Sequence, residues 1–357
     1  MMIPYSISEN YKSFMIKFLK RNGFNNLNFD IAYTSDAYIR DFLYMKDFSR
    51  TSGMLFQIEP HYRTFLEALK RYRKFVALGE FFIREPGEIL RYFVYVYLSL
   101  QNKFRVLNLI RKGQLKFILS VSTSPLVLSG INRYNSLRVT VLDPAYAVEK
   151  EFWKFNSKEK KEDYIVHYAT LSPQKGLFDV VKVMSLLHKK YKINMKLLIF
   201  GRFSREYYKD LFFRKVKSMG LEKSIEYMGY ISDKRQIIDV VSRAKALIYP
   251  SYMDSFSLVV LETLAAGTPV VAYDIPALRE VYGKLSVVKL VKEGDVVGLA
   301  SALNIVLNSN EIYESFKDKN FLSFMEKYSS WDKVAFQEFS SIRLLLEDNS
   351  LVNDKPS

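Results

Sequence analysis

The feature that most constrains the fold is a regular alternation of short apolar runs with amphipathic segments from residue 161 onward. The apolar runs predict strands, and the segments with a period near 3.6 residues predict helices. A strand that alternates with a helix implies a parallel sheet covered by helices on both faces. The predicted strands are 164–169, 196–200, 225–228, 246–249 and 270–273, and the predicted helices are 177–191, 206–219, 234–244, 258–266 and 277–281.

The first half of the chain shows the same alternation more faintly. We predict strands at 2–6, 28–33, 54–58, 75–78, 116–121 and 138–142, and helices at 11–21, 37–45, 63–72, 86–110 and 125–133. A chain of 357 residues is long enough for two cores. The predicted class is therefore α/β, with Rossmann-like domains at 1–155 and 156–327, a helix at 328–346 that packs back across their junction, and a flexible tail at 347–357.

Cysteine and histidine content limits the chemistry that is available. The chain has no cysteine and three histidines, so disulfides, thiolate metal sites and histidine-rich metal sites are not expected. The first residues lack a basic segment followed by an apolar one, which predicts no signal peptide. The most apolar window, 89–100, is shorter than the roughly 20 residues that span a bilayer. We expect a cytoplasmic protein that needs neither a metal ion nor a resident cofactor.

The positive charge lies mainly in the first half. Residues 1–150 hold 22 Lys and Arg against 12 Asp and Glu, which gives +10 of the net charge of +15. A basic face attracts phosphate groups, nucleic acid or an anionic membrane. The predicted helix within 61–75 ends in four basic residues, and it is interpreted either as a peripheral membrane contact or as a solvated helix end favoured by the dipole. Nucleic acid is disfavoured as a partner because no recognised binding motif is present.

Candidate binding residues follow the predicted strands of the second half. In an open parallel sheet, ligands bind at the carboxyl ends of the strands. Lys175 lies where the first of these strands leads into a helix and suits a phosphate group, although a solvated lysine is the plain alternative. Gly201 and Arg202 follow the next strand, where Arg202 meets an anion or faces solvent. Gly229 lets a flat ring approach the main chain, or simply makes a turn.

Two acids bracket the loop and helix that follow the strand at 246–249. Asp254 precedes a turn that leads into a helix, where free N–H groups favour an anion. Because Asp254 would repel a phosphate, it suits a neutral hydroxyl. Glu262 lies among apolar helical residues and is costly to bury alone, so a vicinal diol is its suitable ligand. The plain alternative makes Asp254 a helix N-cap and Glu262 a surface residue. Together with Lys175 and Gly229 at the same sheet edge, the two acids predict a nucleotide-sugar pocket.

Six motifs occur in order between residues 164 and 310. They are L-S-P-Q-K-G, I-F-G, Y-M-G-Y-I, L-I-Y-P-S, D-S-F-S-L-V-V-L-E and A-A-G-T-P-V-V-A-Y-D-I-P-A-L-R-E. Together they resemble the donor-binding domain of glycosyltransferase family 4, the group 1 enzymes, and the upstream F-I-L-S-V-S-T-S is similar to the family's acceptor domain. The resemblance implies a GT-B architecture, in which two Rossmann-like domains face each other across a cleft. It also implies metal-independent sugar transfer, mostly with retention, from a nucleotide-diphosphate sugar to a glycan, lipid-linked or protein acceptor.

The resemblance also assigns roles to positions of this sequence. It implies that Glu262 binds the ribose hydroxyls, that Asp254 contacts the transferred sugar and that Lys175 binds the donor diphosphate. The base would lie against the loop around Gly229. The remaining candidate donor-binding residues are Gly201, Arg202, Tyr230, Ile231, Ser255, Phe256, Ser257 and Leu258.

The chain departs from the family pattern near the donor. Residues 169–170 (Ala-Thr) replace a Gly-Arg pair, which leaves Arg202 as the candidate for a second diphosphate contact. Asp254 is shorter than the usual Glu, and Ser255 and Ser257 replace glycines, which narrows the space beside the sugar.

The first domain departs from the pattern as well, because it has no glycine-rich loop after its first strand and no counterpart of the family's histidine. The strand end F-V-A-L-G-E instead offers Glu80, a candidate catalytic residue beside Asp254 and Lys175 that would position the acceptor. Two other hypotheses stay open: a GT-B nucleotide-sugar epimerase, and a catalytically silent binding protein that uses its basic face.

Overall fold

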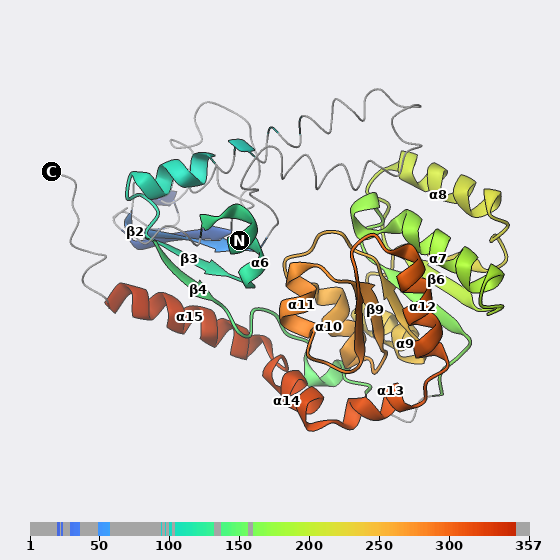
Figure 1. Ribbon diagram of the computed structural model, residues 1–357. Helices are drawn as coiled ribbons and strands as arrows, with labels where there is room; N and C mark the ends of the chain where they lie inside the picture. Colours follow the sequence, from blue (N-terminus) through green and yellow to red (C-terminus); the bar gives the residue numbers. More distant parts are fainter. Residues whose placement is uncertain are drawn as a thin grey trace.

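The computed structural model describes residues 20–21, 23, 29–35, 49–57, 94, 97, 100–101, 104–131, 137–155 and 160–347. Two parallel sheets lie side by side, each with its own helices (Figure 1). The elements predicted at 2–6, 37–45, 63–72 and 75–78, the basic residues of 61–75, Glu80 and the tail after 347 fall outside the described residues. The predicted domain boundaries stay predictions.

The first sheet has four parallel strands in the order β1-β2-β3-β4. They are β1 (Phe29–Ser35), β2 (Ser49–Phe56), β3 (Phe117–Ser120) and β4 (Arg138–Val141). Three match the predicted ranges closely, whereas β2 begins at Ser49 rather than at 54. Both faces of β3 are buried. On one face, Ile118 packs with the helical residues 104–111 and with α6 (Thr123–Ser129). On the other face, Phe117 and Leu119 belong to the larger core that continues into the second sheet.

The second sheet has six parallel strands in the order β10-β9-β8-β5-β6-β7. They are β5 (Tyr164–Tyr168), β6 (Lys196–Phe200), β7 (Ile225–Tyr227), β8 (Leu247–Tyr249), β9 (Val270–Tyr273) and β10 (Val288–Val291). From β5 the chain builds outward to β7, and then returns to β8 on the other side of β5. The five predicted strands are confirmed. The strand β10 was not predicted, because its four residues at the sheet edge include the exposed Lys289 and give only a weak apolar signal.

Helices cover both faces of the second sheet (Figure 1). Tyr164 and Tyr168, which share one face of β5, donate hydrogen bonds to the Val240 carbonyl of α9 (2.7 Å) and the Val259 carbonyl of α10 (2.9 Å). On the other side α7 packs against α8 and α12. The helices are α7 (Leu177–Lys189), α8 (Glu206–Ser218), α9 (Lys234–Arg243), α10 (Leu258–Ala265), α11 (Pro276–Tyr282), α12 (Val296–Leu307), α13 (Glu311–Glu314) and α14 (Lys319–Lys327), with short 3₁₀ turns η4 (Lys150–Phe152), η5 (Pro173–Lys175) and η6 (Ser315–Lys317).

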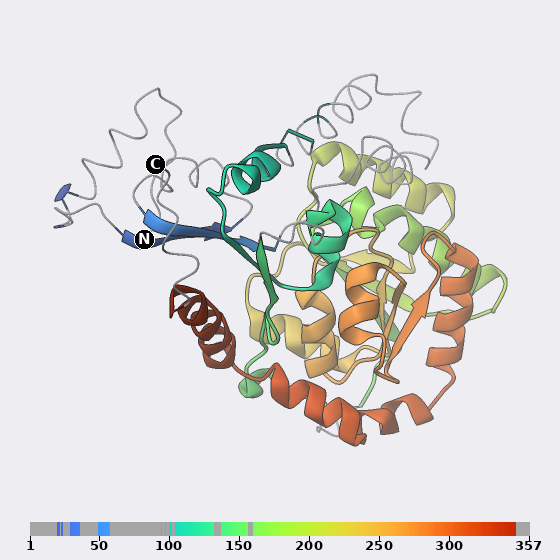
Figure 2. The same ribbon diagram turned by 60° about the vertical axis from the view of Figure 1, so that its left-hand side comes forward.

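The last helix returns to the first sheet, as the sequence predicts. Figures 1 and 2 show α14 and α15 (Trp331–Glu347) running from beneath the second sheet toward the first. There α15 contacts β3, and Glu338 accepts a hydrogen bond of 2.7 Å from the Tyr33 hydroxyl of β1. In the part of the chain that the structure describes, no helix combines the length and apolar character needed to cross a membrane.

Candidate functional site

The candidate site lies where the strand order of the second sheet reverses, between β5 and β8. Loops that leave the carboxyl ends of two such strands diverge and frame a ligand crevice. In this protein the loop after β5 comes close to the loop after β8 at Gly176, which has a φ of +74°. A Cβ at this position would lie 2.2 Å from the Pro250 carbonyl oxygen, so only glycine fits. The Lys-Gly pair of the first loop is thereby held against the loop after β8.

Lys175 and Asp254 form an ion pair between these two loops. Lys175 Nζ lies 2.9 Å from Asp254 Oδ2 and donates a second bond of 2.9 Å to the Met253 carbonyl. Asp254 Oδ2 also accepts a bond of 2.6 Å from the Tyr249 hydroxyl at the end of β8. Burial would lower the pKa of Lys175, but Tyr249 and Asp254 raise it; burial would raise the pKa of Asp254, but Lys175 and Tyr249 lower it. Both groups are therefore charged at neutral pH.

The turn after Asp254 places the start of α10 beside this pair. Phe256 is only 2% exposed and packs its ring against Tyr146 and Tyr282, and this packing anchors the turn to the core. Ser257 lies directly before α10, which begins at Leu258. The backbone of Ser257 is in the left-handed region, with a φ of +73°. Its hydroxyl is buried near the Tyr249 hydroxyl, but no hydrogen bond of normal geometry joins Ser257 Oγ to a described residue. Free N–H groups at a helix start, next to a fixed lysine, suit an anionic ligand.

Glu262 lies in α10 and is paired with a residue that the sequence analysis did not single out. Lys234, the first residue of α9, places its Nζ 3.2 Å from Glu262 Oε1. The Glu262 side chain is 12% exposed and that of Lys234 30%. Burial raises the pKa of Glu262, and Lys234 partly opposes this rise. The surface-residue alternative for Glu262 does not hold, because its carboxylate is largely buried.

The ends of β6 and β7 form a separate cluster. Gly201 donates from its N–H to the Gly229 carbonyl at 2.9 Å, and a Cβ on Gly201 would lie 1.9 Å from the Ala169 oxygen. The Arg202 guanidinium stacks on the Tyr230 ring, 4.0 Å from its centroid. Tyr230 and Ile231 line a depression of about 690 Å³ beside α9. Among the described residues no hydrogen bond or ion pair joins Arg202 to the Lys175 and Asp254 pair, so its role as a second diphosphate contact stays a prediction.

The first sheet reaches this site through three contacts. Ser255 Oγ donates to the Gln57 carbonyl and Ser122 Oγ donates to the Ser255 carbonyl, each at 2.5 Å. Thr123 donates from its N–H (2.9 Å) and from its hydroxyl (2.5 Å) to the Glu280 carboxylate of α11. The loop that carries Asp254 is thus bonded directly to the facing domain. Glu80, the candidate for positioning the acceptor, lies outside the described residues.

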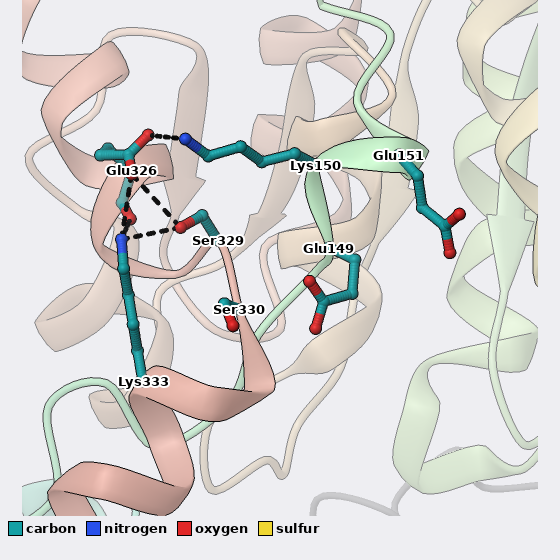
Figure 3. A pocket seen from close by; sticks show the side chains of 7 residues that line it. All are labelled: Glu149, Lys150, Glu151, Glu326, Ser329, Ser330 and Lys333. Carbon is teal, nitrogen blue, oxygen red and sulfur yellow. Dashed lines mark hydrogen bonds and ion pairs between the residues drawn. The ribbon is translucent and has the colours of Figure 1, made fainter.

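A second polar pocket, of about 540 Å³, lies where the two connections between the sheets meet (Figure 3). Glu326 of α14 sits between Lys150 of η4 (2.7 Å) and Lys333 of α15 (3.0 Å), and the Trp331 N–H donates to Glu149 at 3.0 Å. Glu326 thus pairs with a lysine from each of the two connections. This pocket therefore ties the crossover to the returning helix.

Three residues at the site, Tyr249, Glu280 and Lys234, were not among the predicted site residues. Tyr249 lies in L-I-Y-P-S and Glu280 ends A-L-R-E, so both stand inside motifs already noted. Lys234 follows the Y-M-G-Y-I loop without any signal of its own, and its contact with Glu262 appears only when α9 packs against α10. Among the described residues, no group of three or more His, Asp or Glu is placed to hold a metal ion.

Comparison with known proteins places this site in context. Residues 149–321 match the family model of glycosyl transferases group 1. The chain is 24% identical over 191 residues to O-antigen chain mannosyltransferase B of Escherichia coli, which covers 52% of this chain and 46% of that protein. It is 30% identical over 145 residues to the phosphatidyl-myo-inositol mannosyltransferase of Mycobacterium leprae, covering 40% and 37%. The matches thus span less than half the length of these relatives.

Solved structures share the fold over nearly the whole chain. Sucrose-phosphate synthase from Thermosynechococcus elongatus superposes with a TM-score of 0.64 at 17% identity, covering 96% of this chain and 81% of that one. Anabaena Alr3699/HepE, solved in complex with UDP and glucose, gives a TM-score of 0.65 at 13% identity, covering 94% and 81%. The predicted α/β class, with two Rossmann-like domains facing each other, is confirmed.

Proposed function

Because residues 149–321 match the family model of group 1 glycosyl transferases and the chain shares the fold of solved GT-B structures, we propose that the protein is a retaining glycosyltransferase. It transfers a sugar from a nucleotide-diphosphate sugar to a glycan, lipid-linked or protein acceptor, and needs no metal ion. The donor binds at the carboxyl edge of the second sheet, between β5 and β8.

The observation that carries this proposal is the Lys175–Asp254 pair beside the start of α10. A fixed ammonium next to free helix N–H groups is suited to a diphosphate, whose charge grows as the sugar leaves. Asp254 and the turn through Ser257 lie next to it and are suited to the hydroxyls of the sugar. Phosphate and sugar contacts are therefore adjacent, as a diphosphate-linked sugar requires.

The reaction follows from this arrangement. The bond between the anomeric carbon and the diphosphate oxygen breaks through an oxocarbenium-like state, and Lys175 with the α10 N–H groups stabilises the departing diphosphate. An acceptor hydroxyl then forms the new bond to the anomeric carbon from the same face and passes its proton to the departing diphosphate oxygen. Glu262 holds the ribose, and the base lies along the Gly229, Tyr230 and Ile231 loop, where a depression is available.

The proposed partners are a nucleotide-sugar donor and an acceptor at a membrane surface. The structure of the similar Anabaena protein contains UDP and glucose, which supports a nucleotide-sugar donor for this chain without specifying its base. The basic first half, with +10 of the net charge, supports an acceptor at an anionic membrane surface. Contact with the membrane would then be peripheral.

Glu262→Gln tests the donor site more cleanly than removal of Lys175, because loss of Lys175 would leave the buried Asp254 charge without its cation. UDP, GDP and ADP, followed by their glucose, mannose and N-acetylglucosamine forms, are screened by thermal shift. We expect one base to bind the native protein and the variant to lose at least about tenfold in affinity. The control is Glu226→Gln, since Glu226 is an exposed residue of the edge strand β7 that pairs with Lys196.

Two outcomes would count against the proposal. If none of these nucleotides binds, the chain is not a nucleotide-sugar enzyme and the silent binding protein is favoured. If a labelled donor is converted without any acceptor, the epimerase is the better assignment.

A further inference from the structure

Glu262 has a single charged partner among the described residues, and that partner comes from another helix. Lys234 Nζ lies 3.2 Å from Oε1, and no other described residue forms an ion pair or hydrogen bond with the carboxylate. With 12% of the side chain exposed, Glu262 is too buried to be solvated as an ordinary surface acid. Oε1 is thus occupied by Lys234, while Oε2 is left for another donor.

The position of Lys234 is unfavourable for α9 itself. It is the first helical residue, it is followed by Arg235, and the first turn of α9 contains no acid. A cation at a helix N-terminus is opposed by the helix dipole, at a cost of about 0.3–1 kcal/mol. Asp233 already caps the helix by accepting from the Arg235 N–H at 2.9 Å. The lysine is therefore not explained by helix stability.

A second contact holds the lysine in place. Lys234 Nζ lies 5.2 Å from the centre of the Phe152 ring, in the turn η4 of the crossover between the sheets. A cation near an aromatic face is attracted to it. With Phe152 and Glu262 both holding it, the ammonium has a defined position although the side chain is 30% exposed.

We propose that Lys234 is a positioning residue for the nucleoside diphosphate donor: it fixes the Glu262 carboxylate so that the free oxygen accepts the ribose hydroxyls. This inference rests on the proposed function and adds to it a residue that decides how strongly the ribose is recognised. Because Lys234 acts through the hydrogen bonds between Glu262 and the ribose hydroxyls, it should strengthen the binding of ribonucleotides more than that of their deoxy forms.

The charge state of Glu262 supports the same role. A carboxylate accepts two hydroxyl bonds well only when it is ionised. Burial raises the pKa of Glu262, and Lys234 of α9 opposes that rise. The other titratable groups facing Glu262 are Tyr168 of β5 and Tyr282 of α11. Their hydroxyls donate to the Val259 and Ser257 carbonyls, so neither holds Glu262 ionised. Loss of Lys234 should therefore raise the pKa of Glu262 further.

The test compares Lys234→Met and Lys234→Arg with the native protein. Calorimetry measures the Kd of UDP, GDP or ADP, whichever the native protein binds, and of its 2′-deoxy analogue, between pH 6 and 8.5. Lys234→Met should weaken the ribonucleotide at least about tenfold and the deoxy analogue much less, with the largest loss at low pH. Lys234→Arg should restore most of the affinity. Lys196→Met, which breaks the exposed pair with Glu226, serves as the matched control.

The outcomes separate this inference from the proposed function. If the native protein binds none of the three nucleotides, the proposed function fails. If it binds one, and Lys234→Met weakens the ribonucleotide and the deoxy analogue equally or neither of them, Lys234 belongs to a structural ion pair and the inference is wrong.

Discussion

Replacement of Ser257 by glycine should stabilise the protein. Ser257 has a φ of +73°, in the left-handed region that side chains with a Cβ rarely adopt. Its hydroxyl is buried, and among the described residues nothing forms a hydrogen bond with it. The Tyr249 hydroxyl lies nearby and donates its proton to Asp254 at 2.6 Å, and Ser257 Oγ makes no hydrogen bond of normal geometry to the Tyr249 oxygen. The native residue is thus unfavourable in both its backbone and its side chain.

The expected gain combines two terms and one loss. Left-handed backbone costs about 1–2 kcal/mol for an ordinary residue, and an unpaired buried hydroxyl costs roughly 1–3 kcal/mol. Glycine relieves both but gains about 0.4–1 kcal/mol of extra entropy in the unfolded chain. Since the serine Cβ also loses its packing contacts, the net stabilisation should be about 1–3 kcal/mol. In a domain of about 150–250 residues, each kcal/mol of stabilisation raises the Tm by roughly 2–4 °C.

The assay is thermal unfolding of Ser257→Gly, Ser257→Ala and the native protein. Ser257→Ala removes the hydroxyl and keeps the left-handed backbone, so it should recover only the part of the gain that comes from the hydroxyl. An equal or lower Tm for Ser257→Gly would refute the reasoning, because it would mean that the hydroxyl has a partner or that the turn adopts another conformation. If the hydroxyl serves the donor, the glycine variant should be more stable and also bind the nucleotide-sugar more weakly.

Two further predictions concern pH and the contact between the domains. His167 is buried in β5, and burial lowers its pKa to about 4 from 6.5. The unfolded chain therefore binds this proton at a higher pH than the folded protein, so stability should fall as pH drops from about 6.5 to about 4, by up to roughly 1.4 kcal/mol per unit. An NMR titration of the three histidines in which all titrate near 6.5 would contradict this. Glu280→Ala should loosen the domain contact by removing the acceptor for Thr123. The chain has no cysteine, so dyes on cysteines introduced at the exposed positions Val127 and Lys284 report the distance between the two domains. An unchanged FRET distribution in Glu280→Ala would show that Glu280 does not hold the domains together.

The second sheet was predictable because its central strands β5, β8 and β9 are buried on both faces. β5 and β9 are apolar or aromatic at almost every position, so composition alone marks them. The edge strand β10 escaped prediction because only part of it is buried. The helix α12 escaped as well, because it is apolar on most sides and lacks a clear helical period.

The sequence by itself determined the class of fold, the resemblance of its second half to group 1 glycosyl transferases and the identity of the residues at the strand ends, because these depend on local pattern and motif order. Only the tertiary structure decided which of these residues act together. The Lys175–Asp254 pair joins positions 79 residues apart, and its formation depends on β5 and β8 becoming neighbours in the sheet. Glu262 and Lys234 meet because α9 and α10 share one face of that sheet. Motifs name side chains one at a time, whereas an ion pair needs two surfaces to pack, and packing is a property of the whole chain.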